Sequence, residues 1–388
     1  MKILYVAHST LPTAGSTKAL HNLVRYVSEC GVEPIIVVPD SDGVYKEWLS
    51  EGFKVVAINY RIQVYPPLRN LKDLIFFLPR TIGRFYLNRK AAKTLSRLIE
   101  DEDVKLVHSN TSVIDVGYHT ARLLNIPHVY HIREYADRIN LHYIPTNRVF
   151  YDNIKKSATI SITHDVQEYY HLTESQKPSI VVYDGVLPEQ KTLCCEQKEG
   201  YFLYAGRIEP VKGLDFLLLG YASYVKQTAH PYRLKVAGAM YRPSYFSLVK
   251  KIIQENGLED MVEFLGERSD IIELMQHAQA IIISSTFEGF GFCMAEAMFN
   301  GCLVIGRDLT GTHEQFENGL RIHGKEIGLR FTTITELTDC LKLISSGDND
   351  MLTEMRQRAF ETVNKLYSSQ SCAKQVCEFY KVVLNSQS

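Results

Sequence analysis

Short runs of β-branched and other apolar residues alternate with helix-compatible segments along nearly the whole chain. In the first half these runs are residues 3–6, 34–38, 54–58, 104–107, 128–132, 159–162 and 180–182. A second series follows the polar stretch 188–200 and comprises residues 201–205, 234–237, 262–265, 280–283 and 303–305. Strands that alternate with helices form right-handed βαβ units and parallel sheets. The pattern therefore predicts an α/β chain of two Rossmann-like domains, whose sheets we expect to face each other across a cleft.

Length, charge and termini exclude several classes of protein. The 388 residues suffice for two to three domains, and a hydrophobic share of 45% is that of a globular chain. Basic and acidic residues number 43 and 44, which argues against a nucleic-acid binder. The apolar run before His8 is too short for a signal peptide, and no stretch approaches the roughly 20 residues of a membrane span. We expect a cytoplasmic protein with reduced thiols.

Polar residues follow the predicted strands, where parallel sheets bind their ligands. The residues at these strand ends are His8, His108 and Asn110, Arg133 and Glu134, His164 and Asp165, Arg207, Ser284 and Ser285, and Asp308. Taken singly, each is equally compatible with a solvated or capping role. Their common edge is what indicates a site.

Residues 206–213 join a predicted strand to a predicted helix and contain Gly206, Arg207, Lys212 and Gly213. A helix N-terminus presents backbone N–H donors, and two added cations make a site suited to a diphosphate. The alternative is a pair of surface cations.

Residues 288–296 form a second such element, in which Gly289 and Gly291 would let backbone donors approach an anion. The third glycine of a dinucleotide fingerprint is absent. Glu288 and Glu296 lie eight residues apart, so both carboxylates could face one ligand. They suit an acid–base pair of a glycosidase or acceptors for sugar hydroxyls. Two solvent-exposed glutamates are the remaining alternative.

The combination resembles the retaining nucleotide-sugar glycosyltransferases of family GT4, which have the GT-B fold. The shared motifs are Gly206-Arg207 with Lys212-Gly213, and the E-x7-E pair Glu288 and Glu296 followed by Ala297-Met298 and Gly301. The resemblance extends to Val107-His108-Ser109-Asn110, Phe264-Leu265-Gly266 and Thr310-Gly311-Thr312-His313-Glu314, in which Thr310 is a substitution. It also includes Ala14-Gly15, where the family usually has Gly-Gly, and Tyr183-Asp184-Gly185-Val186, where it usually has Pro-Asn-Gly-Val.

The resemblance implies a domain plan and a role for each matching residue. Residues 1–185 would form the acceptor-side domain, 186–365 the donor-binding domain, and 366–388 a helix that crosses back to the first domain. Arg207 and Lys212 would hold the donor diphosphate, while Gly15 would let the N-terminal loop close over it. Glu288 would bind the donor sugar and Glu296 the nucleotide ribose. Sugar and phosphate would meet backbone groups of Phe290, Gly291, Phe292, Cys293 and Met294, and Arg268 falls in the region near the base.

The N-terminal half also departs from the family at a position near the reacting sugar. Where relatives often carry a histidine near the reacting sugar, this chain has Arg133, which the resemblance makes a catalytic candidate. Arg133, Glu134 and His108 are the expected acceptor-side residues. Arginine cannot act as a base because it stays protonated. His131 lies within a strand and is expected to be structural.

The resemblance implies transfer of a sugar, with retention, from a nucleotide diphosphate sugar such as a UDP-sugar to an acceptor hydroxyl. Polysaccharide or glycolipid biosynthesis is the expected setting, with a glycan or lipid-linked acceptor. No cofactor or metal is expected, because Arg207 and Lys212 can neutralise the diphosphate. An epimerase or phosphorylase on the same scaffold, or a noncatalytic nucleotide-sugar-binding partner, remains open.

Residues 61–100 carry nine basic and two acidic side chains, a net charge of +7. Aromatic residues interleave with these charges, which suits a peripheral contact with an anionic membrane at its inner face. The alternative is a solvated basic helix whose aromatic side chains pack inward.

Overall fold

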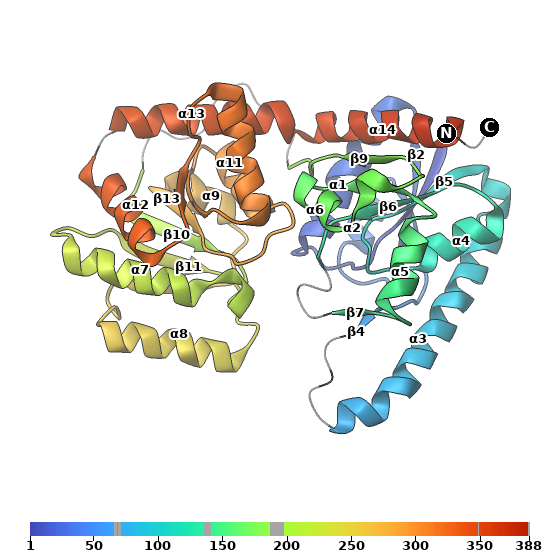
Figure 1. Cartoon of the computed structure of the whole chain (residues 1–388), viewed down its shortest axis with the longest axis horizontal. Helices are drawn as coiled ribbons and strands as arrows, with labels where there is room; N and C mark the ends of the chain where they lie inside the picture. Colours follow the sequence, from blue (N-terminus) through green and yellow to red (C-terminus); the bar gives the residue numbers. More distant parts are fainter. Residues whose placement is uncertain (66–67, 69–70, 136–140, 187–197, 348, 387–388) are drawn as a thin grey trace. The chain divides into compact units, whose positions relative to one another are not determined.

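The computed structural model describes residues 1–65, 68, 71–135, 141–186, 198–347 and 349–386. It divides into two compact units, one of residues 1–185 with 369–388 and one of residues 186–368. The predicted α/β fold with two parallel sheets is confirmed, and every predicted strand is found (Figure 1).

Within the described part of the first unit, seven parallel strands form a sheet in the order β3-β2-β1-β5-β6-β8-β9. These strands are β1 (Lys2–Val6), β2 (Glu33–Val38), β3 (Lys54–Ala57), β5 (Val104–Ser109), β6 (His128–Ile132), β8 (Ala158–Ser161) and β9 (Ser179–Val181). The short strands β4 (Val64–Tyr65) and β7 (His142–Tyr143) pair antiparallel outside this sheet. The strand order reverses direction between β1 and β5, so the ligand edge lies beyond their carboxyl ends.

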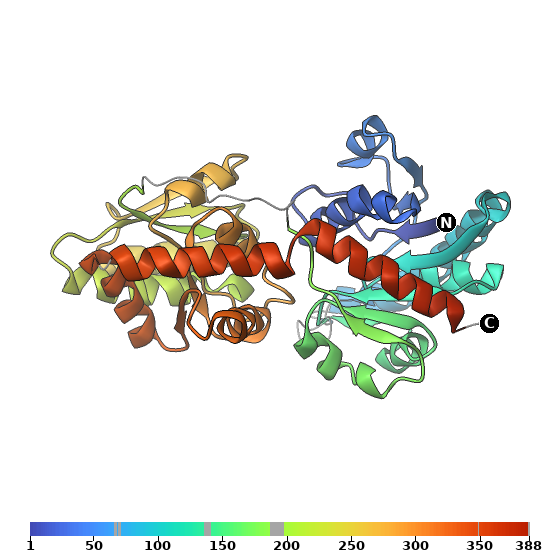
Figure 2. The same cartoon turned by 90° about the horizontal axis from the view of Figure 1, so that it is seen from above.

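The helices of the first unit cover both faces of its sheet. They are α1 (Gly15–Val27), α2 (Tyr45–Ser50), α3 (Leu71–Leu98), α4 (Val116–Leu124), α5 (Asn147–Ile154), α6 (His164–Tyr169) and α14 (Ser369–Asn385), with short 3-10 turns η1 (Ser28–Cys30), η2 (Glu100–Glu102) and η3 (Leu172–Glu174). On one face α1, α2 and α14 share a core with Ile3 and Tyr5. On the other, α3 and α4 pack on Leu4 and Val6. The alternation of β1 side chains between two cores explains why the strand is apolar throughout. Figure 2 shows α14 lying beside α1.

In the second unit, the described residues form six parallel strands in the order β12-β11-β10-β13-β14-β15. They are β10 (Tyr201–Ala205), β11 (Arg233–Ala237), β12 (Val262–Gly266), β13 (Ala280–Ile283), β14 (Leu303–Arg307) and β15 (Leu329–Phe331). The order reverses between β10 and β13, the two strands that precede the glycine-containing loops.

The second unit's helices are amphipathic or buried against this sheet. They are η4 (Pro210–Lys212), α7 (Leu214–Gln227), α8 (Pro243–Asn256), α9 (Ile271–His277), α10 (Phe292–Phe299), α11 (Thr310–His323), α12 (Ile334–Ser346) and α13 (Asn349–Leu366). Helices α7, α8 and α12 share one core with the sheet. Helix α12 begins at a capping box of Thr333 and Glu336, whose reciprocal hydrogen bonds fix its first turn.

No helix in the described part of the chain is both long enough and apolar enough to span a bilayer.

Candidate functional site

Lys212 and Glu288 meet at the carboxyl edge of the second unit's sheet. Lys212 ends η4 after β10, and Glu288 lies in the loop after the adjacent strand β13. The Lys212 Nζ atom donates to Glu288 Oε1 at 2.7 Å, and their side chains are 23% and 17% exposed. A lysine has three N–H donors, so two remain for an anion. The pair brings together a cation and a carboxylate that are 76 residues apart in sequence.

The two loops that carry this pair are fastened to each other. The Ser284 hydroxyl donates to the Lys212 carbonyl at 2.9 Å, and the Thr286 N–H donates to the Val211 carbonyl at 2.9 Å. Gly213 has φ +64°, and a Cβ there would lie 2.2 Å from the Ser284 carbonyl oxygen. A side chain at Gly213 would therefore push the loops apart.

The loop 288–291 is held from α11. Thr310 Oγ1 accepts from the Glu288 N–H at 3.1 Å, and the Gly311 N–H donates to the Glu288 carbonyl at 3.0 Å. Gln315 Nε2 donates to the carbonyls of Phe290 and Gly291 at 2.5 and 3.1 Å. Gly291 has φ +89° and forms the N-cap of α10. These contacts place the N-terminus of α10, the positive end of its helix dipole, at the ligand edge.

Sequence reasoning missed the supporting role of Thr310 and Gln315. In the sequence Thr310 is only the first residue of the motif 310–314. In the structure it adopts φ +48°, which a β-branched residue rarely does. This conformation places the Thr310 hydroxyl where it accepts a hydrogen bond from the Glu288 N–H. Nothing in the sequence marks Gln315 except its place one helical turn beyond Gly311.

Arg207 lies at the same edge but has different partners. Its guanidinium forms an ion pair with Glu209 at 2.7 Å and lies 5.1 Å from the Tyr241 ring centre. The Arg207 side chain is 53% exposed, so it can turn toward a ligand without leaving a buried cavity. The Arg207 side chain is thus accessible to a ligand, while its own partners are Glu209 and Tyr241 rather than Lys212.

The expected donor-binding residues on α10 use their backbone, because their side chains largely face inward. Phe290 is buried against Tyr367 with ring centres 5.0 Å apart, and Met294 is fully buried. The half-buried Cys293 contacts the Ala205 carbonyl at 3.6 Å, and Phe292 beside it is also half-buried. Glu296 lies one turn along α10 and is half-buried.

Arg268 is not brought to this centre. It follows the edge strand β12, two strands from β10, a separation of about 10 Å in a sheet. Its guanidinium is exposed and ion-paired with Asp270.

In the first unit Arg133 is buried in a network of its own. The guanidinium donates to the Asn110 carbonyl at 2.9 Å and to His131 Nδ1 at 3.0 Å, and it forms an ion pair with Asp184. The residue is only 8% exposed, and burial lowers the pKa of Arg133 to about 10. In this structure Arg133 links the end of β6 to Asn110 and Asp184, and contact with the reacting sugar stays a prediction.

His108 lies beneath this network rather than at its surface. Since Arg133 donates to His131 Nδ1, that nitrogen carries no proton, and His108 Nε2 lies 3.3 Å from it. His108 Nδ1 is hydrogen-bonded to the Tyr380 hydroxyl at 2.6 Å, and this hydroxyl also donates to the Tyr5 hydroxyl at 3.1 Å. Burial and the nearby Arg133 charge hold the pKa of both histidines well below the usual value. His108 is fully buried, so it supports the edge without contacting an acceptor, and His131 is structural as expected.

Glu134 organises the loop after β5. Its Oε1 atom accepts from the Ser112 N–H and hydroxyl, each at 2.7 Å, and from the Val113 N–H at 3.1 Å. Burial raises the pKa of Glu134. The chain itself thus supplies three donors to Oε1, and a role of Glu134 in acceptor binding stays a prediction.

Gly15, the first residue of α1, follows the loop that leaves β1 at His8. A Cβ built on Gly15 would meet no atom within 4 Å, so the fold itself does not require glycine there. The free space lies at the ligand edge of the first unit.

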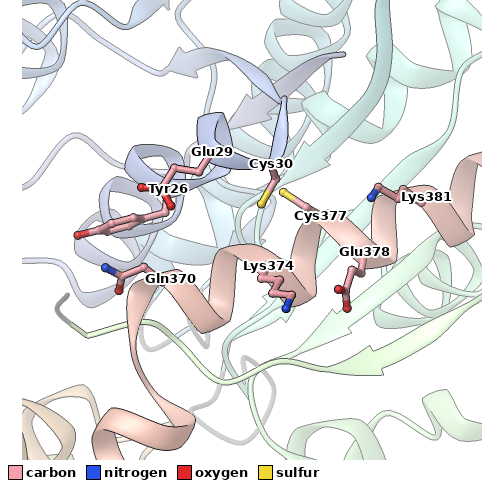
Figure 3. A pocket seen from close by; sticks show the side chains of 8 residues that line it. All are labelled: Tyr26, Glu29, Cys30, Gln370, Lys374, Cys377, Glu378 and Lys381. Atoms are coloured by element: carbon pink, nitrogen blue, oxygen red, sulfur yellow. The ribbon is translucent and has the colours of Figure 1, made fainter. Parts of the chain in front are cut away.

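A pocket of about 370 Å³ lies elsewhere in this unit, between the end of α1, η1 and α14 (Figure 3). Its lining residues include Tyr26, Cys30, Lys374 and Cys377, and the sulfur atoms of the two cysteines point toward each other. Helix α1 runs from the carboxyl edge of the sheet back to the start of β2, so this pocket lies at the opposite edge from Gly15.

Part of the second unit is similar to a known family. Residues 190–356 match the family model described as glycosyl transferases group 1, a match that covers less than half of the chain.

Curated relatives of the family are similar to parts of the chain. N-acetyl-alpha-D-glucosaminyl L-malate synthase of Bacillus anthracis is 27% identical over 36% of this chain and 35% of its own length. The uncharacterized glycosyltransferase YqgM of Bacillus subtilis is 26% identical over 54% of this chain and 57% of its own length. The matches thus span about a third to just over half of these relatives.

A solved structure shows that the whole chain has the GT-B fold. The structure of Anabaena Alr3699/HepE in complex with UDP has a TM-score of 0.76 and 20% sequence identity, covering 98% of this chain and 100% of that one. The same protein has been solved with UDP-glucose.

Proposed function

We propose that this chain is a retaining, GT4-like hexosyltransferase that moves a sugar from a UDP-sugar to an acceptor hydroxyl. Its setting is the cytoplasm, in polysaccharide or glycolipid biosynthesis. The second unit binds the donor and the first receives a glycan or lipid-linked acceptor. The observation that carries the proposal is the Lys212–Glu288 pair beside the α10 N-terminus, within the residues that match the glycosyl transferases group 1 model.

The reaction breaks the bond between the anomeric carbon and the diphosphate oxygen. The acceptor oxygen bonds to the same face of that carbon, and its proton passes to a diphosphate oxygen. Negative charge grows on the leaving group, where each preorganised donor is worth about 3 kcal/mol. Lys212, Arg207 and the N–H groups that begin α10 supply this stabilisation. Glu288 accepts from hydroxyls of the donor sugar, and Glu296 from those of the ribose.

We propose that no metal takes part, because two cations and a helix N-terminus already oppose the diphosphate charge. Saturating EDTA should leave the initial rate unchanged. A requirement for added Mg²⁺ or Mn²⁺ would contradict this part of the proposal.

The decisive experiment measures UDP release from a panel of UDP-sugars, with and without glycan or polyprenyl-linked acceptors. Acceptor-dependent release with transfer of the sugar supports the proposal. A changed sugar without release would indicate an epimerase, and release that requires inorganic phosphate would indicate a phosphorylase. Saturable binding without turnover would indicate a noncatalytic partner.

A further inference from the structure

Helix α3 presents an apolar stripe to solvent. Exposed apolar side chains occur at positions 71, 74, 75, 78, 82, 85 and 86, a spacing of three and four residues. At about 100° per residue they fall within an arc of roughly 120° on one side of the helix. Leu78 and Ile82 are 65% and 64% exposed, and Tyr86 is 71% exposed. An amphipathic helix normally turns such a stripe toward the core, but among the residues that the structure describes none covers this stripe.

The opposite side of α3 faces the protein. Phe77 packs edge-to-face on Tyr65 with ring centres 5.1 Å apart, and Arg84 donates to the Val64 carbonyl at 2.7 Å. Further along, Asn88 is buried and bonded to Arg61 and Asp115, while Ala92 and Leu95 join the core. The exposed stripe is therefore fixed in orientation by the C-terminal half of the helix and by β4. Figure 1 shows the N-terminal half of α3 running away from the sheet.

Cations border and extend the stripe. Lys72 and Lys90 lie about 40° beyond its edge, and Arg89 and Lys93 continue it toward the helix C-terminus. All four are exposed, and the Arg89 guanidinium lies 4.8 Å from the Phe85 ring centre. Asp73, the acidic residue of α3, lies on the protein-facing side and is half-buried.

We infer that this face of α3 is a docking surface for an anionic lipid leaflet. The apolar side chains enter the boundary between head groups and acyl chains, and the cations pair with lipid phosphates. The stripe from residue 71 to 86 is about 24 Å long, which suits a helix lying in the plane of the interface. A second copy of the chain fits less well, since the same face would meet itself and carries no acid to pair with its cations. The inference does not rest on the proposed transfer reaction.

The sequence-based expectation placed a membrane contact within 61–100, and the structure refines it. The alternative, aromatic side chains packed inward, is wrong for Phe76, Phe85 and Tyr86, which are exposed. Arg84 instead points toward the protein and donates a hydrogen bond to β4, so it does not belong to the lipid-facing cations.

The first test is cosedimentation of the full chain with phosphatidylcholine vesicles, with and without phosphatidylglycerol. We expect binding to the anionic vesicles that weakens as salt rises, because exposed charges are screened over about 10 Å at 0.1 M. The triple variant Lys72→Glu, Lys90→Glu and Lys93→Glu should lose binding, at about fivefold per cation neutralised. A matched triple reversal at Lys226, Lys251 and Lys325, which are exposed in the second unit, should retain it.

The apolar contribution is tested separately. The double variant Leu78→Gln and Ile82→Gln should reduce partitioning at least tenfold, whereas Leu248→Gln with Ile272→Gln, also exposed, should not. Vesicle binding that survives the first pair, or that is equal on neutral vesicles, would overturn the inference. So would a dimer that forms without lipid and dissociates in the Leu78→Gln, Ile82→Gln variant.

A direct readout places a tryptophan in the stripe. The native Trp48 is fully buried and gives a constant background. Emission of Phe85→Trp should shift to shorter wavelength on adding anionic vesicles, and Leu219→Trp on α7 should not respond. An unshifted Phe85→Trp spectrum would contradict docking through α3. UDP release with a water-soluble acceptor tests the transferase proposal independently of either result.

Discussion

At the scale of single residues, Lys212 is the cation that the structure pairs with Glu288, the carboxylate proposed to bind the donor sugar. Lys212→Ala removes one donor from the leaving diphosphate, so we expect kcat/KM to fall roughly 100-fold, equivalent to about 3 kcal/mol. Lys226→Ala, on an exposed part of α7, is the matched control and should change little. Steady-state kinetics with saturating acceptor measure the effect, and wild-type turnover in Lys212→Ala would remove it from the mechanism.

Glu288 and Glu296 can be told apart by ligand. Glu296→Gln should weaken binding of free UDP, because a neutral amide is a poorer acceptor for the ribose hydroxyls than a carboxylate. Glu288→Gln should affect mainly the UDP-sugar and leave UDP binding close to wild type. Isothermal calorimetry with both ligands separates the two, and equal losses in both variants would contradict the assigned roles.

Buried histidines make the first unit sensitive to acid. Burial lowers the pKa of His128 to about 3, while its ring nitrogens lie 2.9 Å from the hydroxyls of Ser109 and Ser157. Below the unfolded-state pKa of about 6.5 the unfolded chain binds a proton that the native state does not. Stability should therefore fall as pH drops from about 6.5 toward 3, by about 1.4 kcal/mol per pH unit for this histidine.

Urea unfolding at pH 7 and pH 5 measures this loss. His128→Gln should flatten the pH dependence by one proton, and His230→Gln, at an exposed position, should leave it unchanged. An unaltered slope in His128→Gln would show that its proton uptake is not linked to unfolding.

At the scale of elements, a substitution at Gly15 can distinguish a glycine that the fold requires from one that ligand binding requires. Since a Cβ at the start of α1 meets no atom within 4 Å, Gly15→Ala should leave stability unchanged or slightly higher. If the loop closes on the diphosphate, the added methyl group should still weaken UDP-sugar binding. Gly311→Ala is the contrasting variant, because its Cβ would lie 2.7 Å from the carbonyl oxygens of Gly289 and Phe290. It should lower both stability and binding, whereas unaltered binding in Gly15→Ala would remove that glycine from the donor site.

Most of the strands and helices can be predicted from the sequence, but the contacts between their side chains cannot. Parallel strands buried on both faces are continuous apolar runs, so β1 or β13 is visible in the sequence. Strand β15 was missed because it has three residues and includes Arg330. The approach of Lys212 to Glu288 followed from a family resemblance. The burial of Arg133 did not, since its partner Asp184 is 51 residues away and no local pattern encodes that pairing.

At the scale of the whole molecule, the chain returns to its first unit through α14. Seven side chains of this helix, at positions 372, 373, 376, 377, 379, 380 and 383, lie in the core shared with α1 and β1. The Tyr380 hydroxyl is also hydrogen-bonded to His108, which links α14 to the network around Arg133. A helix that is last in sequence thus completes the core of the unit that is first.

Deleting residues 369–388 should therefore unfold the first unit and spare the second. Tyr380→Phe is a milder change than the deletion. It keeps the ring but leaves the buried His108 nitrogen without its hydrogen-bond partner, which should lower the free energy of unfolding by about 1–3 kcal/mol. Calorimetric unfolding should show the transition of the first unit lowered in Tyr380→Phe and absent in the deletion, with the other transition preserved. Val382→Ala, at an exposed position of the same helix, is the control. If the deletion shifted both transitions equally, the two units would unfold as one, and α14 would not belong energetically to the first.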